Sequence, residues 1–115
     1  MQIEYESESV EKIFNDFNLM RKMIGNDRAR AIKKRIDQLK ASVSFGIYLT
    51  TRLGKPHPLY GNLKGDYGIV ITGNVRLIAK PNVKSFEPEA LKDCDTVILR
   101  GVVDYHGGKN EWLIP

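Results

Sequence analysis

The chain has 115 residues, 42% of them hydrophobic and 28% charged, so we expect residues 1–115 to form one domain with a modest core. Its formal net charge of +4 favours an anionic partner such as a nucleic acid. No apolar run is long enough to span a bilayer, and the acidic start MQIEYESESVEK does not look like a secretory signal. These features predict a cytoplasmic protein without membrane contact.

The N-terminal segment is predicted to form a strand followed by a helix. Residues 1–5 alternate between polar and apolar side chains, as in a short strand. A helix then begins with Ser7 or Ser9 as its N-cap and ends at Gly25. The residues that give this helix one apolar face are Val10, Ile13, Phe14, Phe17 and Met20.

A second, basic helix is predicted from a cap at Asn26 or Asp27 to about Ala41. Its narrow apolar stripe consists of Ile32, Ile36, Leu39 and Val43. Six cations stand against the single acid Asp37 between positions 28 and 40: Arg28, Arg30, Lys33, Lys34, Arg35 and Lys40. This pattern fits a solvated helix face, and it equally fits a surface that binds phosphates or an acidic partner.

The middle of the chain is predicted to be a loop followed by a hairpin. Residues 42–65 are rich in glycine and proline, with one helical turn expected near Tyr48. Two β-rich runs, 66–71 and 75–80, flank the turn pair Gly73–Asn74. Such a pair between two apolar runs is typical of a tight β-hairpin.

The last third of the chain is predicted to contain one long strand. Residues 85–95 form an acidic connection, residues 96–105 the strand, and residues 112–113 a small closing strand. The order β-α-α-β-β-β follows, with two N-terminal helices packed on a small, mainly antiparallel sheet. The fold class is therefore predicted to be α+β.

Strict alternation along the last strand predicts two faces. One face would carry Val97, Leu99, Gly101, Val103 and Tyr105. The other would carry Ile98, Arg100, Val102, Asp104 and His106, so that Asp104 and His106 are neighbours. If Arg76 also points to this second face, imidazole, carboxylate and guanidinium groups surround one cleft.

Such a set of groups suits RNA cleavage by attack of the ribose 2′-OH on the adjacent phosphorus. This reaction needs a base, an acid and cations beside the phosphate, but no metal. Tyr105 could stack on a base. Two plainer interpretations stay open: that Asp104 pairs only with Arg100, and that His57 is a loop residue without a function. No spacing supports a metal site formed by His57, Asp104 and His106, and no cofactor is expected.

Residues 57–78 (HPLYGNLKGDYGIVITGNVRLI) and 97–106 (VILRGVVDYH) resemble the RelE/ParE toxin superfamily, and most of all its HigB-like killer-protein branch. The shared pattern is a His-Pro-Leu loop, a Lys-Gly step, a Gly-Asn hairpin with an Arg-Leu strand, and a terminal Asp-Tyr-His. The resemblance implies a RelE-like fold and the toxin of a type II toxin–antitoxin system. It also implies a metal-independent, ribosome-dependent mRNA endoribonuclease that inhibits translation.

Carried over by position, the resemblance implies which residues act. The catalytic residues would be His106, Asp104, Tyr105, Arg76, Lys64 and His57. The residues expected at an RNA interface are Arg28, Arg30, Lys33, Lys34, Arg52, Lys55 and Arg100. The implied partners are a cognate, HigA-like helix-turn-helix antitoxin, the ribosome and mRNA, with operator DNA reached only through the antitoxin.

Two features depart from the family pattern. Val75 stands before the strand arginine, where an aromatic residue is common, and nine residues follow His106. Two other functions also stay open: a ParE-like toxin that acts by binding gyrase, and a non-catalytic RNA-binding domain. The terminal histidine favours the nuclease.

Overall fold

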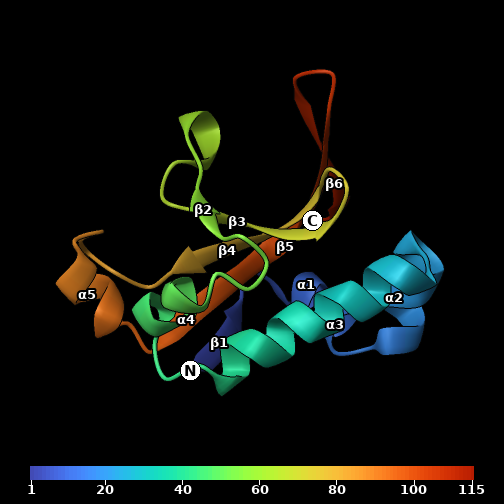
Figure 1. Cartoon of the computed structure of the whole chain (residues 1–115). Helices are drawn as coiled ribbons and strands as arrows, with labels where there is room; N and C mark the ends of the chain where they lie inside the picture. Colours follow the sequence, from blue (N-terminus) through green and yellow to red (C-terminus); the bar gives the residue numbers. More distant parts are fainter.

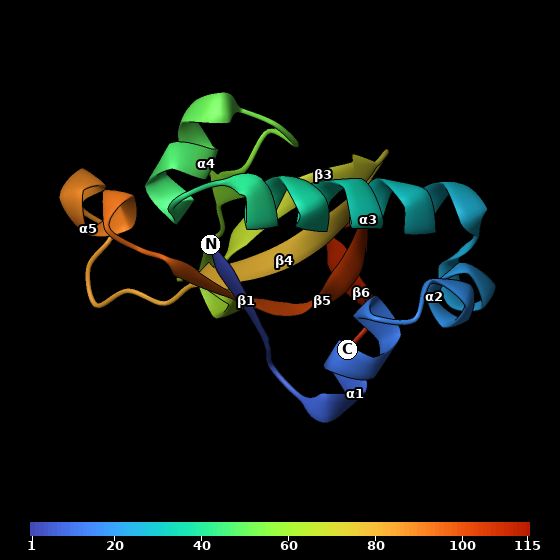
Figure 2. The same ribbon diagram turned by 90° about the horizontal axis from the view of Figure 1, so that it is seen from below.

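The computed structural model describes residues 1–115 as a mixed sheet with helices on one face (Figures 1 and 2). The strands are β1 (Gln2–Tyr5), β2 (His57–Pro58), β3 (Tyr67–Thr72), β4 (Val75–Pro81), β5 (Thr96–His106) and β6 (Lys109–Ile114). The helices are α1 (Glu8–Phe14), α2 (Phe17–Ile24), α3 (Asn26–Ala41), α4 (Phe45–Thr51) and α5 (Pro88–Lys92), with a 3₁₀ turn η1 (Gly61–Leu63). None of these helices has the length and apolar character needed to cross a membrane.

The strand order in the sheet is β1-β5-β4-β3-β2, and β6 also pairs with β5. Only the β1–β5 pair is parallel. The predicted α+β class and the hairpin around Gly73–Asn74 are therefore confirmed. Helix α3 lies across one face of the sheet. The β2–η1 segment and the far end of the β5–β6 hairpin extend from the other side as two arms (Figure 1).

The core lies between the helices and one face of the sheet. Ile32 and Leu39 of α3 are fully buried there, as are Leu77 and Leu99 of the sheet. Phe45 of α4 meets Tyr67 edge to face, with ring centroids 4.9 Å apart. This packing leaves the opposite face of the sheet available for a site.

Several expectations for the helices were wrong. The helix predicted from Ser7 to Gly25 is two helices, because the Asp16 side chain accepts a hydrogen bond from the Leu19 amide and starts α2 afresh. Val43 was expected in the apolar stripe of the second helix but follows its end and is 80% exposed. The helical turn expected near Tyr48 is confirmed and is longer than one turn, as the seven-residue α4. The acidic connection, which was expected to have no helix, contains α5.

A β-bulge at Gly101 overturns the faces predicted for the last strand. Ile78 pairs with Gly101 and Ala79 with Leu99, so β5 carries one extra residue at this point. One inserted residue reverses the alternation of every side chain beyond it. Up to Leu99 the odd positions face the core, whereas after the bulge the even position Val102 does so. Val103 and Tyr105 therefore share the open face with Arg100, not with Leu99.

Candidate functional site

A cleft of about 310 Å³ lies on the open face of the sheet, between the two arms. The β2–η1 arm contributes His57, Leu59, Tyr60 and Leu63. The β3–β4 turn contributes Asn74, and the sheet contributes Arg76, Ile78 and Val103. The β5–β6 arm contributes Tyr105 and Asn110. No acidic residue lines this cleft. Its basic residues are Arg76 and His57.

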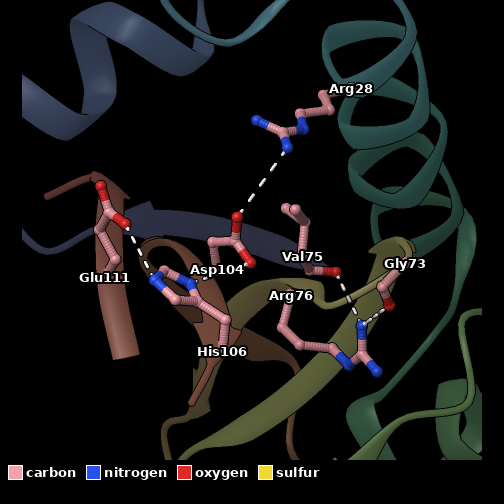
Figure 3. Close-up of polar contacts among 7 residues, drawn as sticks. All are labelled: Arg28, Gly73, Val75, Arg76, Asp104, His106 and Glu111. Carbon is pink, nitrogen blue, oxygen red and sulfur yellow. Dashed lines mark hydrogen bonds and ion pairs between the residues drawn. The ribbon is translucent and has the colours of Figure 1, made fainter. Parts of the chain in front are cut away.

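Arg76 is held in the cleft by backbone groups alone. It pairs with Val103 across β4 and β5, which directs its side chain to the open face. Its Nη1 atom donates to the carbonyl oxygens of Gly73 at 2.6 Å and Val75 at 3.1 Å (Figure 3). No carboxylate neutralises this guanidinium. The turn therefore orients a full positive charge that can bind an anion.

His57 is the imidazole of the cleft. Its Nδ1 lies 3.1 Å from the carbonyl oxygen of Lys55, and because a carbonyl only accepts, Nδ1 carries the proton. In the tautomer with the proton on Nδ1, the Nε2 atom carries no hydrogen and can accept one. A Cβ at Gly68, the residue that pairs with His57, would lie 3.5 Å from Nε2, so the ring lies close above β3. Pro56 and Pro58 restrict the backbone on both sides.

Tyr105 lines this cleft, whereas Lys64 lies next to a lining residue. Lys64 directly follows the lining residue Leu63 and ends η1, with an exposed side chain. Tyr105 lines the β5–β6 wall and is 52% exposed. The structure thus brings His57, Arg76 and Tyr105 together and leaves Lys64 beside them.

Asp104 and His106 lie on the other face of the same strand end. The Asp104 carboxylate is 3.9 Å from Arg28 of α3, and the His106 Nδ1 is 3.7 Å from Asp104. The His106 Nε2 is 3.5 Å from Glu111 of β6. Figure 3 shows these groups directed away from the Arg76 guanidinium. Asp104 and His106 are neighbours as predicted, but the expectation that they share one face with Arg76 was wrong.

Arg100 lies on the open face, where two carboxylates compensate its charge. Its Nε donates to Glu6 at 3.0 Å, and its Nη1 donates to the buried carboxylate of Asp66. Burial raises the pKa of Asp66, and the hydrogen bond from Arg100 opposes this effect. The predicted alternative that Asp104 pairs with Arg100 was wrong, because Asp104 pairs with Arg28. Arg100 therefore offers less free charge to an RNA than the sequence indicates.

The basic residues of α3 lie on the helical side, across the sheet from the cleft. Arg30, Lys33 and Lys34 line an open groove, in which Lys33 also pairs with Asp37 at 3.0 Å. Arg52 and Lys55 follow α4 and lead into the β2–η1 arm. Of the expected RNA contacts, the structure therefore brings only Lys55 next to a lining residue, through its carbonyl contact with His57.

Three lining residues with polar groups were not identified as site residues from the sequence: Tyr60, Asn74 and Asn110. Tyr60 follows the His-Pro-Leu loop directly, which was a usable signal. Asn74 was interpreted only as a turn residue. Asn110 enters the cleft because β6 folds back along β5, pairing Asn110 with Tyr105. No group of three or more His, Cys, Asp or Glu side chains in the structure could hold a metal ion.

The fold is similar to that of two solved bacterial structures. One, described as a YoeB-YefM complex from Staphylococcus aureus, matches with a TM-score of 0.55 at 18% identity, over 92% of this chain and 97% of that chain. The other, a YoeB/ParE toxin from Agrobacterium tumefaciens, matches with a TM-score of 0.50 at 19% identity, over 86% and 92%. No protein-family model and no curated protein sequence matches the chain. The chain thus shares its overall fold with these two structures.

Proposed function

We propose that this protein is the toxin of a type II toxin–antitoxin pair and cleaves ribosome-bound mRNA without a metal. The fold it shares with the two toxin structures supports the toxin role. One observation carries the chemistry: His57 and an Arg76 without a carboxylate partner line the same acid-free cleft. The assignment to the HigB-like branch rests on the His-Pro-Leu, Lys-Gly and Asp-Tyr-His motifs.

In the proposed reaction, the ribose 2′-oxygen forms a bond to phosphorus while the bond from phosphorus to the 5′-oxygen breaks. The free Nε2 of His57 takes the 2′-OH proton, and Tyr105 on the opposite wall supplies a proton to the leaving 5′-oxygen. Arg76 stabilises the charge that develops on the equatorial oxygens, and Lys64, which follows the lining residue Leu63, adds a second cation. The products are a 2′,3′-cyclic phosphate and a 5′-hydroxyl.

His106 has a positioning role in this proposal. Its ring lies between Asp104 and Glu111, which belong to the two strands of the β5–β6 arm. Tyr105 and Asn110, on the other face of that arm, both line the cleft. By contacting both strands on the face away from the cleft, the His106 ring holds in place the part of the arm that carries Tyr105 and Asn110.

The partners follow from the same proposal. A cognate antitoxin binds and restrains the toxin, in line with the solved complex that carries YefM beside YoeB. The motif resemblance suggests a HigA-like helix-turn-helix antitoxin, through which alone the pair contacts operator DNA. The ribosome and mRNA are the proposed targets in the cytoplasm, and the +4 charge suits both.

The test incubates purified toxin with programmed ribosomes and end-maps the mRNA. The wild type is expected to cut and leave 2′,3′-cyclic phosphate ends, whereas His57→Ala and Arg76→Ala are expected to lose cleavage. Ends with a 3′-hydroxyl would exclude attack by the 2′-OH. Toxicity without any cleavage, accompanied by loss of gyrase supercoiling activity, would instead establish the ParE-like alternative.

A further inference from the structure

Tyr60 is an exposed aromatic residue that is not part of the hydrophobic core. Its side chain is 80% exposed, yet it lines the cleft from the β2–η1 arm. Tyr105 lines the same cleft from the opposite arm and is 52% exposed. Two exposed aromatic rings that line one cleft from its two arms each offer a face on which a flat ligand can stack.

The backbone of Tyr60 is held in place although its ring is free. The Leu59 amide donates to the Asp66 carbonyl at 2.9 Å, and the Leu63 amide donates to the Tyr60 carbonyl at 3.3 Å. The arm is also joined to the sheet by the pairing of Pro58 with Tyr67. An aromatic ring on an anchored backbone loses little conformational freedom when it binds a ligand.

Asn110 adds a hydrogen-bonding group at the edge of the same space. It belongs to β6, in the segment that follows His106, and pairs with Tyr105 on the cleft face. An asparagine side chain offers one acceptor and two donor hydrogens, which match the edge of a nucleobase. The cleft thus combines two aromatic walls, one amide, and the Arg76 cation for a phosphate.

We propose that the cleft binds one unstacked nucleobase of single-stranded RNA between Tyr60 and Tyr105, with the Asn110 amide at its edge. This inference rests on the proposed function and names two residues, Tyr60 and Asn110, that determine its substrate. A duplex keeps its bases stacked and paired, so the cleft excludes double-stranded RNA. Tyr60 supplies stacking that any base can use, and Asn110 supplies the preference among bases.

The binding experiment uses a fluorescein-labelled, mixed-sequence RNA hexamer with 2′-O-methyl groups, which cannot be cleaved by 2′-OH attack. Anisotropy should show binding of the single strand and not of the same strand in a duplex. Tyr60→Ala should weaken binding roughly 5- to 150-fold, the range that loss of one stacked base gives, and Tyr60→Phe less than about twofold. Phe86→Ala is the matched control, because Phe86 is also exposed but does not line the cleft.

The part played by Asn110 is tested with four homopolymer hexamers of the same chemistry. The wild type should prefer one base, and Asn110→Ala should flatten that preference. Equal binding by Tyr60→Ala and the wild type, or tight binding of the duplex, would overturn the inference. Ribosome-bound mRNA is assayed in parallel: if the wild type cuts and Tyr60→Ala cuts equally well, only this inference fails, whereas a wild type that does not cut refutes the proposed nuclease.

Discussion

Arg76 and His106 lie on adjacent strands of the sheet but point to opposite faces (Figure 3). Arg76 pairs with Val103, whose side chain faces the cleft. His106 instead lies beside Asp104, which reaches towards α3 on the other face. A phosphodiester bound on one face of the sheet therefore cannot contact both Arg76 and His106. We assign the phosphate contact to Arg76 and a positioning role to His106.

The first prediction contrasts the two residues. Arg76→Ala should reduce single-turnover cleavage of ribosome-bound mRNA by about 100-fold or more, as is typical when a charge-stabilising donor is removed from a transition state. His106→Ala should reduce it by less than about tenfold, since it loosens a wall of the cleft and removes no reacting group. Glu111→Gln is the matched control for His106, because it weakens the same contact from β6. A His106→Ala variant as inactive as Arg76→Ala, alongside an active Glu111→Gln, would return His106 to a catalytic role.

The second prediction concerns the surface beneath His57. An added Cβ at Gly68 would lie 3.2 Å from Leu59 Cδ2, so the Leu59 side chain must shift slightly. It would also lie 3.5 Å from His57 Nε2, in van der Waals contact, and so would occupy the space beneath the imidazole. Gly68→Ala should slow cleavage by about tenfold, because small displacements of a reacting group are costly. In a double-mutant cycle, Gly68→Ala should have little further effect once His57 is alanine. Fully additive losses would mean that Gly68 acts through something other than the imidazole.

How far the sequence predicts this site depends on local signals. The Gly73–Asn74 turn, the Ser7 cap and the pairing of Asp104 with His106 depend on neighbouring residues, and all three are observed. The face of Arg76 relative to His106 depends on an inserted residue at Gly101. A glycine within an apolar strand signals such a bulge but does not say where the partner strand shifts. The strict alternation assumed along the last strand therefore placed Asp104 and His106, rather than Val103 and Tyr105, beside Arg76.

The contribution of the last nine residues to the cleft could not be predicted from the sequence either. The segment after His106 begins with two glycines and three polar residues, and only residues 112–113 were expected to form a short closing strand. Its pairing with β5 is non-local and is stabilised by Ile114, which is fully buried in the core. Only this pairing brings Asn110 to the cleft, so a search confined to family motifs could not find it.

The third prediction tests the bulge itself. Gly101 has a φ of +153°, and a Cβ there would lie 2.1 Å from the Ile114 carbonyl oxygen and 2.9 Å from the Trp112 ring. Gly101→Ala should therefore lower the free energy of unfolding by about 2–5 kcal/mol, through backbone strain and displacement of β6. Gly61→Ala shares the positive φ, +65°, but meets nothing within 4 Å, so it should cost only about 1–2 kcal/mol. Urea denaturation measures both, and equal losses would show that the clash with β6 is absent.

The fourth prediction concerns stability at alkaline pH. Tyr48 is fully buried, its hydroxyl donates to the Leu53 carbonyl at 2.5 Å, and burial raises its pKa from 10.0 to about 12, with Arg35 opposing the effect. The folded state thus holds this proton more tightly than the unfolded chain does. Below pH 10 the proton is bound in both states and has no effect on the pH dependence, whereas stability falls as the pH rises from 10 towards 12.

The loss over this window should amount to about 2–3 kcal/mol from Tyr48 alone, because one pKa unit corresponds to about 1.4 kcal/mol. Tyr48→Phe should be about 1 kcal/mol less stable than the wild type at neutral pH, because it lacks the hydrogen bond, yet lose less stability above pH 10. Tyr5 and Tyr67, whose pKa values burial also raises, retain their contribution in this variant and set the remaining slope. Urea denaturation at pH 8 and pH 11 measures the difference, and parallel losses in both proteins would show that the Tyr48 hydroxyl is reached by solvent.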